Sequence, residues 1–297
     1  MTNKLTLDDF PILNRISSVK YRDKDVVLRK INNIIRDGPE KLQVVTDFDL
    51  TLTKQHVDGK AHLSSFGIFA KCKQLPPQYA EMDTRTHKKY RPIETDPHIS
   101  IKDKTAAMEE WMEISEEFLK GYEFDSSELE QVAEKYGTDL REGTKNLMDK
   151  LNSAKIPVLV FSAGLGDVVE AILRHNNVLL DNVEIISNFL NYSGKTLDGF
   201  KGKKIHVFNK NETVLEKEHL KRLENRKNII LMGDSVGDTT MCNGIKDVDN
   251  VFKIGFLYHE NNEIVEKSLK DYMDVFDVVL IDDQTMDLPW SILKRII

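Results

Sequence analysis

Short apolar runs alternate with amphipathic segments along this chain. Residues 42–46, 157–161 and 228–232 are rich in aliphatic and β-branched side chains, and weaker runs lie at 252–256 and 278–281. Apolar runs of this length, separated by helical segments, are typical of parallel strands that helices cover on both faces. The pattern therefore predicts an α/β fold with a Rossmann-like, doubly wound and mostly parallel sheet.

The segments between these runs show helical periodicity. Apolar residues recur at helical spacing within residues 25–37, before the stop signal Gly38-Pro39. Residues 54–151 contain amphipathic stretches and prolines and predict a helical insertion, whereas the glycines within 191–202 predict a surface hairpin or loop. We therefore expect two domains, which are a core formed by residues 1–53 and 152–297 and an inserted helical cap formed by residues 54–151.

Polar side chains follow the three strongest predicted strands directly. Asp47 and Asp49 come after the first strand, Ser162 after the second and Asp234 after the third. Ligands of open α/β sheets bind outside the carboxyl ends of the strands. The four side chains are therefore expected to lie near one site.

Two carboxylates in an Asp-x-Asp pattern suit phosphoryl transfer. One can attack phosphorus while the other donates a proton to the leaving oxygen. Asp234 would complete a Mg²⁺ site with Asp47, because Mg²⁺ prefers carboxylates, waters and phosphate oxygens. Asp238 would support that site without coordinating the metal itself. A structural alternative is that residues 233–238 form a turn that caps a helix.

A phosphate site also needs donors and positive charge. Ser162 and Ala163 can offer a hydroxyl and backbone amides, and Gly164 allows a close approach before the amino terminus of a helix. Lys210 follows another short apolar segment and would offset the charge of the aspartates and a phosphate. Without the other motifs, Lys210 would be interpreted as a solvated surface lysine.

These four motifs, in this order, resemble the haloacid-dehalogenase-like phosphatase superfamily, in which a large insertion between the first two motifs forms a cap. Longer segments are similar to the cytosolic 5′-nucleotidase III family. That family includes the pyrimidine 5′-nucleotidases and the 7-methylguanosine-phosphate-specific 5′-nucleotidases. The similar segments lie at residues 45–52, 161–168, 199–202, 206–210 and 231–235.

The resemblance implies a role for each motif. Asp47 is the nucleophile, and Asp49 is the proton donor that afterwards activates water. Mg²⁺ is held by the Asp47 side chain, the Asp49 backbone carbonyl and Asp234. The residues that grip the phosphate are Ser162, Ala163 and Lys210.

Candidate base contacts lie in the predicted cap. By the resemblance, Glu94 reads the base and Ser115 is a further base contact; a carboxylate can accept hydrogen bonds from the exocyclic amine of cytosine or from N1–H and N2–H of guanine. Phe66, Phe69 and Trp111 could stack on a base, with extra attraction for the cationic ring of 7-methylguanine. Glu94 and the three aromatic residues could instead have purely structural roles.

The composition excludes several classes of protein. Hydrophobic residues make up 40% and charged residues 31% of the 297 residues, and the net charge is −7 without a basic stripe for nucleic-acid polymers. No run approaches the ~20 apolar residues that cross a bilayer, and no signal-peptide pattern opens the chain. We expect a cytoplasmic monomer with no membrane contact, in which Cys72 and Cys242 are reduced thiols.

Taken together, the sequence predicts a Mg²⁺-dependent nucleoside 5′-monophosphate phosphohydrolase. Its expected substrates are 7-methylguanosine monophosphate and pyrimidine monophosphates such as CMP, hydrolysed through an aspartyl-phosphate. Three alternatives stay open. They are a nucleoside phosphotransferase that uses the same intermediate, a non-catalytic binder of methylated guanosine nucleotides, and a phosphatase for another small phosphomonoester.

Overall fold

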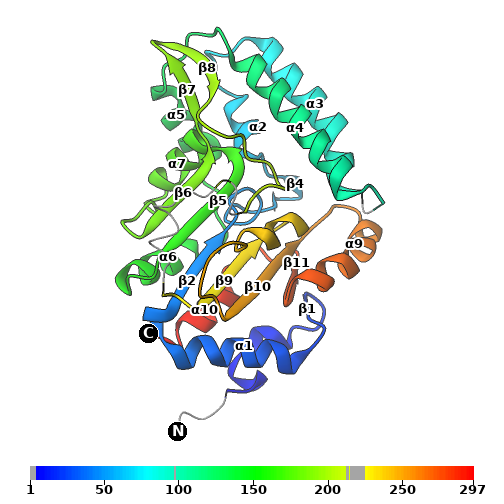
Figure 1. The fold of residues 1–297 in the computed structure, drawn as a ribbon, viewed down its shortest axis with the longest axis vertical. Coiled ribbons are helices and arrows are strands. Elements are labelled where there is room, and N and C mark those ends of the chain that lie inside the picture. Colours follow the sequence, from blue (N-terminus) through cyan, green and yellow to red (C-terminus); the bar gives the residue numbers. More distant parts are fainter. Residues whose placement is uncertain (1–4, 97, 212–213, 215–224) are drawn as a thin grey trace.

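The computed structural model describes residues 5–96, 98–211, 214 and 225–297, and its central sheet has seven strands (Figure 1). All neighbouring pairs are parallel except the pair of β1 and β11 at one edge. The five predicted strand segments all lie in this sheet, so the predicted α/β fold with a mostly parallel sheet is confirmed. In spatial order the strands are β1 (Val19–Lys20), β11 (Val278–Ile281), β10 (Asn250–Leu257), β9 (Asn228–Gly233), β2 (Leu42–Thr46), β5 (Val158–Leu165) and β6 (Val183–Asn188).

Two apolar clusters cover the two faces of the sheet. Successive side chains of a strand point to opposite faces, and along β2 Val44 belongs to one cluster whereas Val45 belongs to the other. The sheet is therefore doubly wound. Side chains of α1 (Lys24–Asp37), α6 (Thr144–Ser153), α7 (Gly166–His175) and α10 (Asp287–Leu293) contribute to the first cluster, and side chains of α9 (Asn262–Val275) contribute to the second.

Helix α1 shows how local chemistry sets its boundaries. The Asp23 side chain accepts hydrogen bonds from the backbone amides of Asp25 and Val26, which satisfies donors at the helix start. Gly38 follows the last turn with a φ of 79°, a conformation that favours glycine. The predicted helix and its stop signal are both confirmed.

A second group of elements lies beyond the carboxyl edge of the sheet (Figure 1). The long helices α3 and α4 pack side by side, and the hairpin of β7 and β8 packs against α4. The side chain of Glu116 on α4 anchors this contact, since it accepts hydrogen bonds from the backbone N–H of Phe200 (3.2 Å) and from Lys204 Nζ (2.8 Å). The elements are β3 (His56–Val57), β4 (Lys60–Ala61), α2 (Ser65–Phe69), α3 (Pro77–Thr95), α4 (Ile101–Leu119), α5 (Ser127–Tyr136), β7 (Leu190–Ser193) and β8 (Thr196–Phe200).

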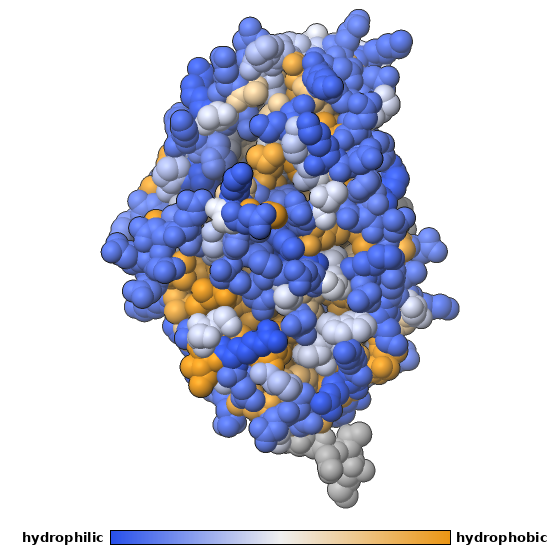
Figure 2. All heavy atoms as spheres, turned by 180° about the vertical axis from the view of Figure 1, so that it is seen from behind, coloured by the Kyte–Doolittle hydropathy of each residue, from blue (hydrophilic) through white to orange (hydrophobic). Residues whose placement is uncertain are grey.

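The hairpin expected within residues 191–202 is present. The division into a core at 1–53 and 152–297 and a cap at 54–151 stays a prediction, because α6 straddles its second boundary and packs against α10 of the core. Among the described helices, none is both long and apolar enough to span a bilayer. On the face drawn in Figure 2, hydrophilic residues predominate and hydrophobic residues form separate patches.

Candidate active site

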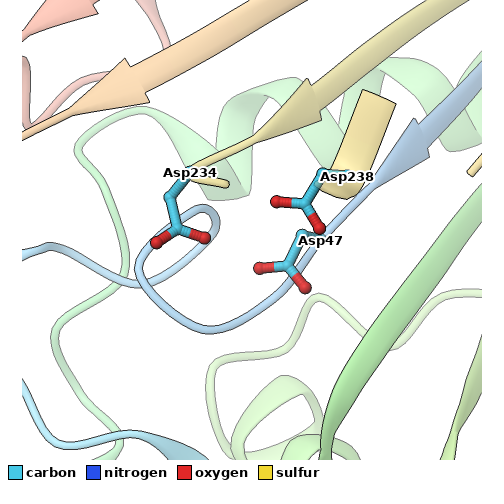
Figure 3. A group of neighbouring side chains, drawn as sticks. All are labelled: Asp47, Asp234 and Asp238. Atoms are coloured by element: carbon cyan, nitrogen blue, oxygen red, sulfur yellow. The ribbon is translucent and has the colours of Figure 1, made fainter. Parts of the chain in front are cut away.

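Three aspartates converge at the carboxyl ends of two neighbouring strands. Strands β2 and β9 are hydrogen-bonded neighbours, and the backbone N–H of Asp47 extends their pairing by donating to the carbonyl of Met232 at 3.0 Å. Asp234 directly follows β9, and Asp238 lies in the 3₁₀ helix η4 (Val236–Thr240). One carboxylate oxygen from each aspartate lies within 4.8 Å of the other two (Figure 3). The predicted convergence of Asp47 and Asp234 is therefore present.

Lys210 lies between two of these carboxylates. Its Nζ is 2.5 Å from Asp47 Oδ1 and 2.6 Å from Asp238 Oδ1, and the lysine is 2% exposed. Asp238 is held in place by η4, since its Oδ2 accepts a hydrogen bond from the backbone N–H of Ser235 at 2.9 Å. Asp238, expected to support the site without coordinating the metal itself, thus stands beside Asp47 and Asp234 as a third carboxylate.

The cluster has more negative charge than one lysine can offset. Burial raises the pKa of Asp47 to about 7, with a further contribution from Asp238, even though Lys210 opposes the shift. Burial, followed by the charges of Asp238 and Asp47, also raises the pKa of Asp234 well above its usual value. Both shifts mean that the nearby cations do not offset the cost of burying these carboxylates in charged form. A set of oxygen donors with this deficit fits Mg²⁺.

Asp49 is positioned by a serine of the predicted cap. Its Oδ1 accepts a hydrogen bond from the backbone N–H of Ser65 (2.8 Å), and its Oδ2 accepts one from Ser65 Oγ (2.7 Å). Burial raises the pKa of Asp49, although the hydrogen bonds from Ser65 act in the opposite direction. Ser65 Oγ also accepts from the backbone N–H of Leu165 at 3.0 Å, which ties α2 to the end of β5.

Sequence reasoning missed Ser65, although a weak signal was present. Ser64 caps α2 by accepting a hydrogen bond from the backbone N–H of Gly67 at 3.2 Å. The next residue in a capped helix has a backbone N–H without an intrahelical acceptor. A serine pair at a helix start is therefore a recognisable donor site, but nothing local shows which carboxylate it serves.

Arg141 holds the loop that follows Asp49. Its guanidinium donates to the backbone carbonyls of Leu50 (2.7 Å) and Thr51 (2.6 Å) and to that of Asp283, and it lies 3.8 Å from the ring centroid of Phe256. Leu50 has a φ of 62°, which is unusual for a residue with a side chain. The buried arginine therefore stabilises a strained turn directly after the two catalytic candidates, and sequence reasoning missed it.

One cavity of about 500 Å³ joins this cluster to the predicted base contacts. Asp47, Asp49, Asp234, Asp238, Lys210, Ser162 and Ala163 line it from the sheet side, and Glu94, Trp111, Ser115 and Phe66 line it from the helices beyond the sheet edge. These eleven predicted residues are thus brought together around a single space.

Phe69 is the exception. Its side chain is fully buried, and its ring packs against the rings of Tyr79 (5.5 Å between centroids) and Phe124 (5.2 Å). It does not line the cavity among the described residues. The prediction that Phe69 stacks on a base is wrong, because α2 turns this ring into the core.

The end of the cavity that contains Glu94 and Trp111 has a fixed aromatic wall and a paired carboxylate. The ring of Trp111 stacks on Tyr90 with a centroid distance of 5.6 Å and an interplanar angle of 14°. Glu94 Oε1 lies 2.5 Å from a guanidinium nitrogen of Arg91, whose pKa is raised first by Glu94 and also by the charge of Asp234. Arg91, which sequence reasoning also missed, therefore brings positive charge between the two ends of the cavity.

Comparison with known proteins agrees with this geometry. The family described as pyrimidine 5′-nucleotidase (UMPH-1) matches residues 50–297. A 7-methylguanosine phosphate-specific 5′-nucleotidase of Drosophila melanogaster is 46% identical over 296 residues, which cover 99% of this chain and 91% of that protein. The human protein of the same name is 36% identical over 283 residues, which cover 95% of this chain and 93% of that protein.

Solved structures show the same relationship. The crystal structure of cytosolic 5′-nucleotidase IIIB bound to cytidine is 47% identical, has a TM-score of 0.92, and covers 98% of this chain and 97% of its own. A substrate-bound phosphoserine phosphatase, at 17% identity and a TM-score of 0.51, covers 86% of this chain and 98% of its own and is similar in fold alone. The chain therefore belongs to the pyrimidine 5′-nucleotidase (UMPH-1) family and is a 5′-nucleotidase with a haloacid-dehalogenase-like fold.

Proposed function

We propose that this 5′-nucleotidase hydrolyses 7-methylguanosine monophosphate and pyrimidine monophosphates such as CMP, with Mg²⁺ and an aspartyl-phosphate on Asp47. One observation carries the proposal: a single cavity has the buried acidic cluster at one end and Glu94 with Trp111 at the other. A nucleoside monophosphate has the same two ends. The names of the relatives that act on 7-methylguanosine phosphate, and the cytidine in the related structure, support this substrate class.

The reaction would have two steps. An oxygen of Asp47 attacks phosphorus, and the bond from phosphorus to the 5′-oxygen breaks as Asp49 gives that oxygen its proton. Asp49 then removes a proton from water, whose oxygen attacks phosphorus and releases inorganic phosphate from Asp47. The raised pKa of Asp49 fits a carboxyl group that must hold a proton in the first step.

The remaining residues would bind phosphate and metal. Asp47 and Asp234, with the backbone carbonyl of Asp49, would hold Mg²⁺, which would supply positive charge that neutralises the phosphate. Lys210 would hold a phosphate oxygen, together with the hydroxyl of Ser162 and the backbone amide of Ala163.

Base recognition would combine a hydrogen-bond acceptor with a stacking surface. Glu94 would accept from N–H groups on the base edge, and its ion pair with Arg91 keeps the carboxylate in a fixed position. Trp111, held parallel to Tyr90, would stack on the base. A methylated and therefore cationic guanine gains attraction from such a ring.

A phosphate-release panel of CMP, UMP, GMP and 7-methyl-GMP, measured with and without Mg²⁺, tests the proposal. We expect release from CMP and 7-methyl-GMP in the presence of Mg²⁺, with 7-methyl-GMP preferred over GMP by roughly 2- to 30-fold in kcat/KM, the range of a cation–π contact. Equal kcat/KM values for GMP and 7-methyl-GMP would refute the proposed stacking of a cationic base on Trp111. The absence of phosphate release from all four nucleotides would refute the proposed function.

Replacing Gly164 with alanine should impair catalysis through Asp49. A Cβ at this position would lie 2.1 Å from Ser65 Oγ and 2.6 Å from Asp49 Oδ2, so both side chains would have to move. Misplacement of a catalytic group by about 1 Å can cost ~10²-fold in rate. We therefore expect kcat for CMP to fall roughly 10²-fold in Gly164→Ala, with a loss of about 1–3 kcal/mol in stability from overpacking, which leaves the protein folded at assay temperature. A wild-type kcat would show that the close approach to Asp49 is not needed.

We also propose that the protein works in the cytosol as a monomer. The cytosolic name of the related structure supports the location. Size-exclusion chromatography with light scattering would test the monomer, which is expected to have a mass near 34.2 kDa.

A further inference from the structure

His206 lines the same cavity as Glu94 and Trp111. The residue is 4% exposed. Its ring is oriented by its own loop, because Nδ1 accepts a hydrogen bond from the backbone N–H of Phe208 at 3.2 Å. The loop is itself closed by Asn209, whose Oδ1 accepts from the backbone N–H of His206 at 2.8 Å.

The second ring nitrogen of His206 has no partner among the described residues. Nε2 is buried, and no described group donates to it or accepts from it. Since Nδ1 is an acceptor, a neutral ring carries its hydrogen on Nε2. Burial, followed by the charge of Lys203, lowers the pKa of His206 to about 4, so the ring is neutral at physiological pH. The loop therefore fixes one buried N–H donor that the fold does not use, which is an unfavourable state for a polar group.

Besides Lys203, Glu94 is a charged group that acts on this histidine. Its carboxylate raises the pKa of His206 against the two larger effects, and both side chains line the same cavity. Glu94 Oε1 is paired with Arg91. The cavity is thus lined both by a carboxylate acceptor, Glu94, and by a histidine with an unused N–H donor.

We propose that His206 recognises the base together with Glu94: His206 Nε2–H donates to the acceptor atom of the base that is adjacent to the N–H group from which Glu94 accepts a hydrogen bond. In cytosine these neighbours are N3 and the amine on C4. In guanine and 7-methylguanine they are O6 and N1–H. The inference rests on the proposed nucleotidase function. It adds the residue that would donate a hydrogen bond to the acceptor on the base edge.

The chemistry of the base edge determines how one donor would serve both substrate classes. Cytosine and guanine each present an acceptor directly beside an N–H donor, but in opposite order along the base edge, so one donor–acceptor pair in the protein would meet both bases only if they lie in the cavity in different orientations. A buried site that hydrogen-bonds a substrate group rejects analogues that lack the group, because its own polar atom is then left unpaired. A base analogue without the ring acceptor is therefore the sharpest probe.

The test compares CMP with 3-deaza-CMP, which has C–H in place of N3, in three proteins. His206→Asn keeps an acceptor for the backbone N–H of Phe208 but ends short of Nε2, whereas His206→Gln can carry an amide N–H to the Nε2 position. For the wild type we expect kcat/KM to be roughly tenfold lower with 3-deaza-CMP than with CMP, the cost of one buried hydrogen bond. His206→Asn should lose a similar factor on CMP, mainly through KM, and should no longer distinguish the two substrates.

The outcomes separate base recognition from a structural role. His206→Gln should restore much of the discrimination, which would support the proposal even if His206→Asn folds poorly. An unchanged ratio of the two substrates in His206→Asn, or in the wild type a ratio near one, would overturn the proposal while leaving the proposed function intact. If the wild type releases no phosphate from CMP or 7-methyl-GMP, the proposed function fails and the inference fails with it.

Discussion

Asp47→Asn should abolish phosphate release from every nucleotide while leaving the fold intact. The asparagine amide has nearly the shape of the carboxylate but cannot attack phosphorus, so no covalent intermediate can form. Removal of a nucleophile in enzymes that use covalent catalysis lowers kcat by about 10⁴- to 10⁶-fold. We expect a loss in this range for CMP, measured as released inorganic phosphate with saturating Mg²⁺. A kcat within tenfold of the wild type would exclude Asp47 as the nucleophile.

Stability measurements without Mg²⁺ provide the control for this variant. The folded-state pKa of Asp47, about 7, lies above the value near 3.8 that applies to the unfolded chain. For a group with a raised pKa, the stabilising contribution is complete below the unfolded pKa and is lost as pH rises through the folded pKa. The free energy of unfolding of Asp47→Asn should therefore equal or exceed that of the wild type, and its advantage should grow between about pH 4 and pH 7. If the Asp47→Asn variant were unfolded at neutral pH, its inactivity would have a structural cause and would not support Asp47 as the nucleophile.

Much of this site could be predicted because its main parts are local in sequence. Asp47, Ser162 and Asp234 each follow a short run rich in aliphatic and β-branched residues, directly or after one glycine, and parallel strands bring their carboxyl ends to one edge. Neither step requires knowledge of long-range contacts. The pairing of β2 with β9, which sets Asp47 beside Asp234, was the part that only the fold could supply.

The residues that were missed act through contacts between distant segments. Ser65 binds Asp49 across the boundary between the predicted core and cap. Arg141 reaches the carbonyls of Leu50 and Thr51, which lie about ninety residues earlier in the chain. Its sequence neighbourhood is an ordinary polar loop, so no periodicity distinguishes it from a surface arginine. Phe69 was misassigned for a related reason, since a helix of five residues is too short for its pattern to show which side faces the core.

Lys210 provides the second large effect, because it is the buried cation that offsets two carboxylates of the cluster. It binds Asp47 and Asp238 at once and is almost completely shielded from solvent. Burial alone would lower the pKa of Lys210, but the charges of Asp238 and Asp47 raise it above its usual value. Lys210→Met keeps much of the side-chain volume and removes the charge. Removing one partner of a buried ion pair leaves an uncompensated charge and typically costs about 3–5 kcal/mol.

We therefore expect Lys210→Met to lower the free energy of unfolding by about 3–5 kcal/mol in the absence of Mg²⁺. Lys104→Met is the matched control, because Lys104 is also buried but lies on α4 outside the acidic cluster, and burial lowers its pKa. That control should change stability little. Equal unfolding free energies for the two methionine variants would show that the cluster does not depend on Lys210.

Activity should respond differently from stability in the same variant. Mg²⁺ can replace part of the missing positive charge, so added Mg²⁺ should recover some of the stability that Lys210→Met loses. It should not recover the rate, since the variant has lost a fixed donor to the phosphate, and removal of one such donor costs about 10²- to 10³-fold in kcat. Denaturant titrations with and without Mg²⁺, beside kcat for CMP, measure both effects. Recovery of stability and rate in parallel would mean that Lys210 only balances charge, whereas recovery of stability alone assigns it a contact with the phosphate.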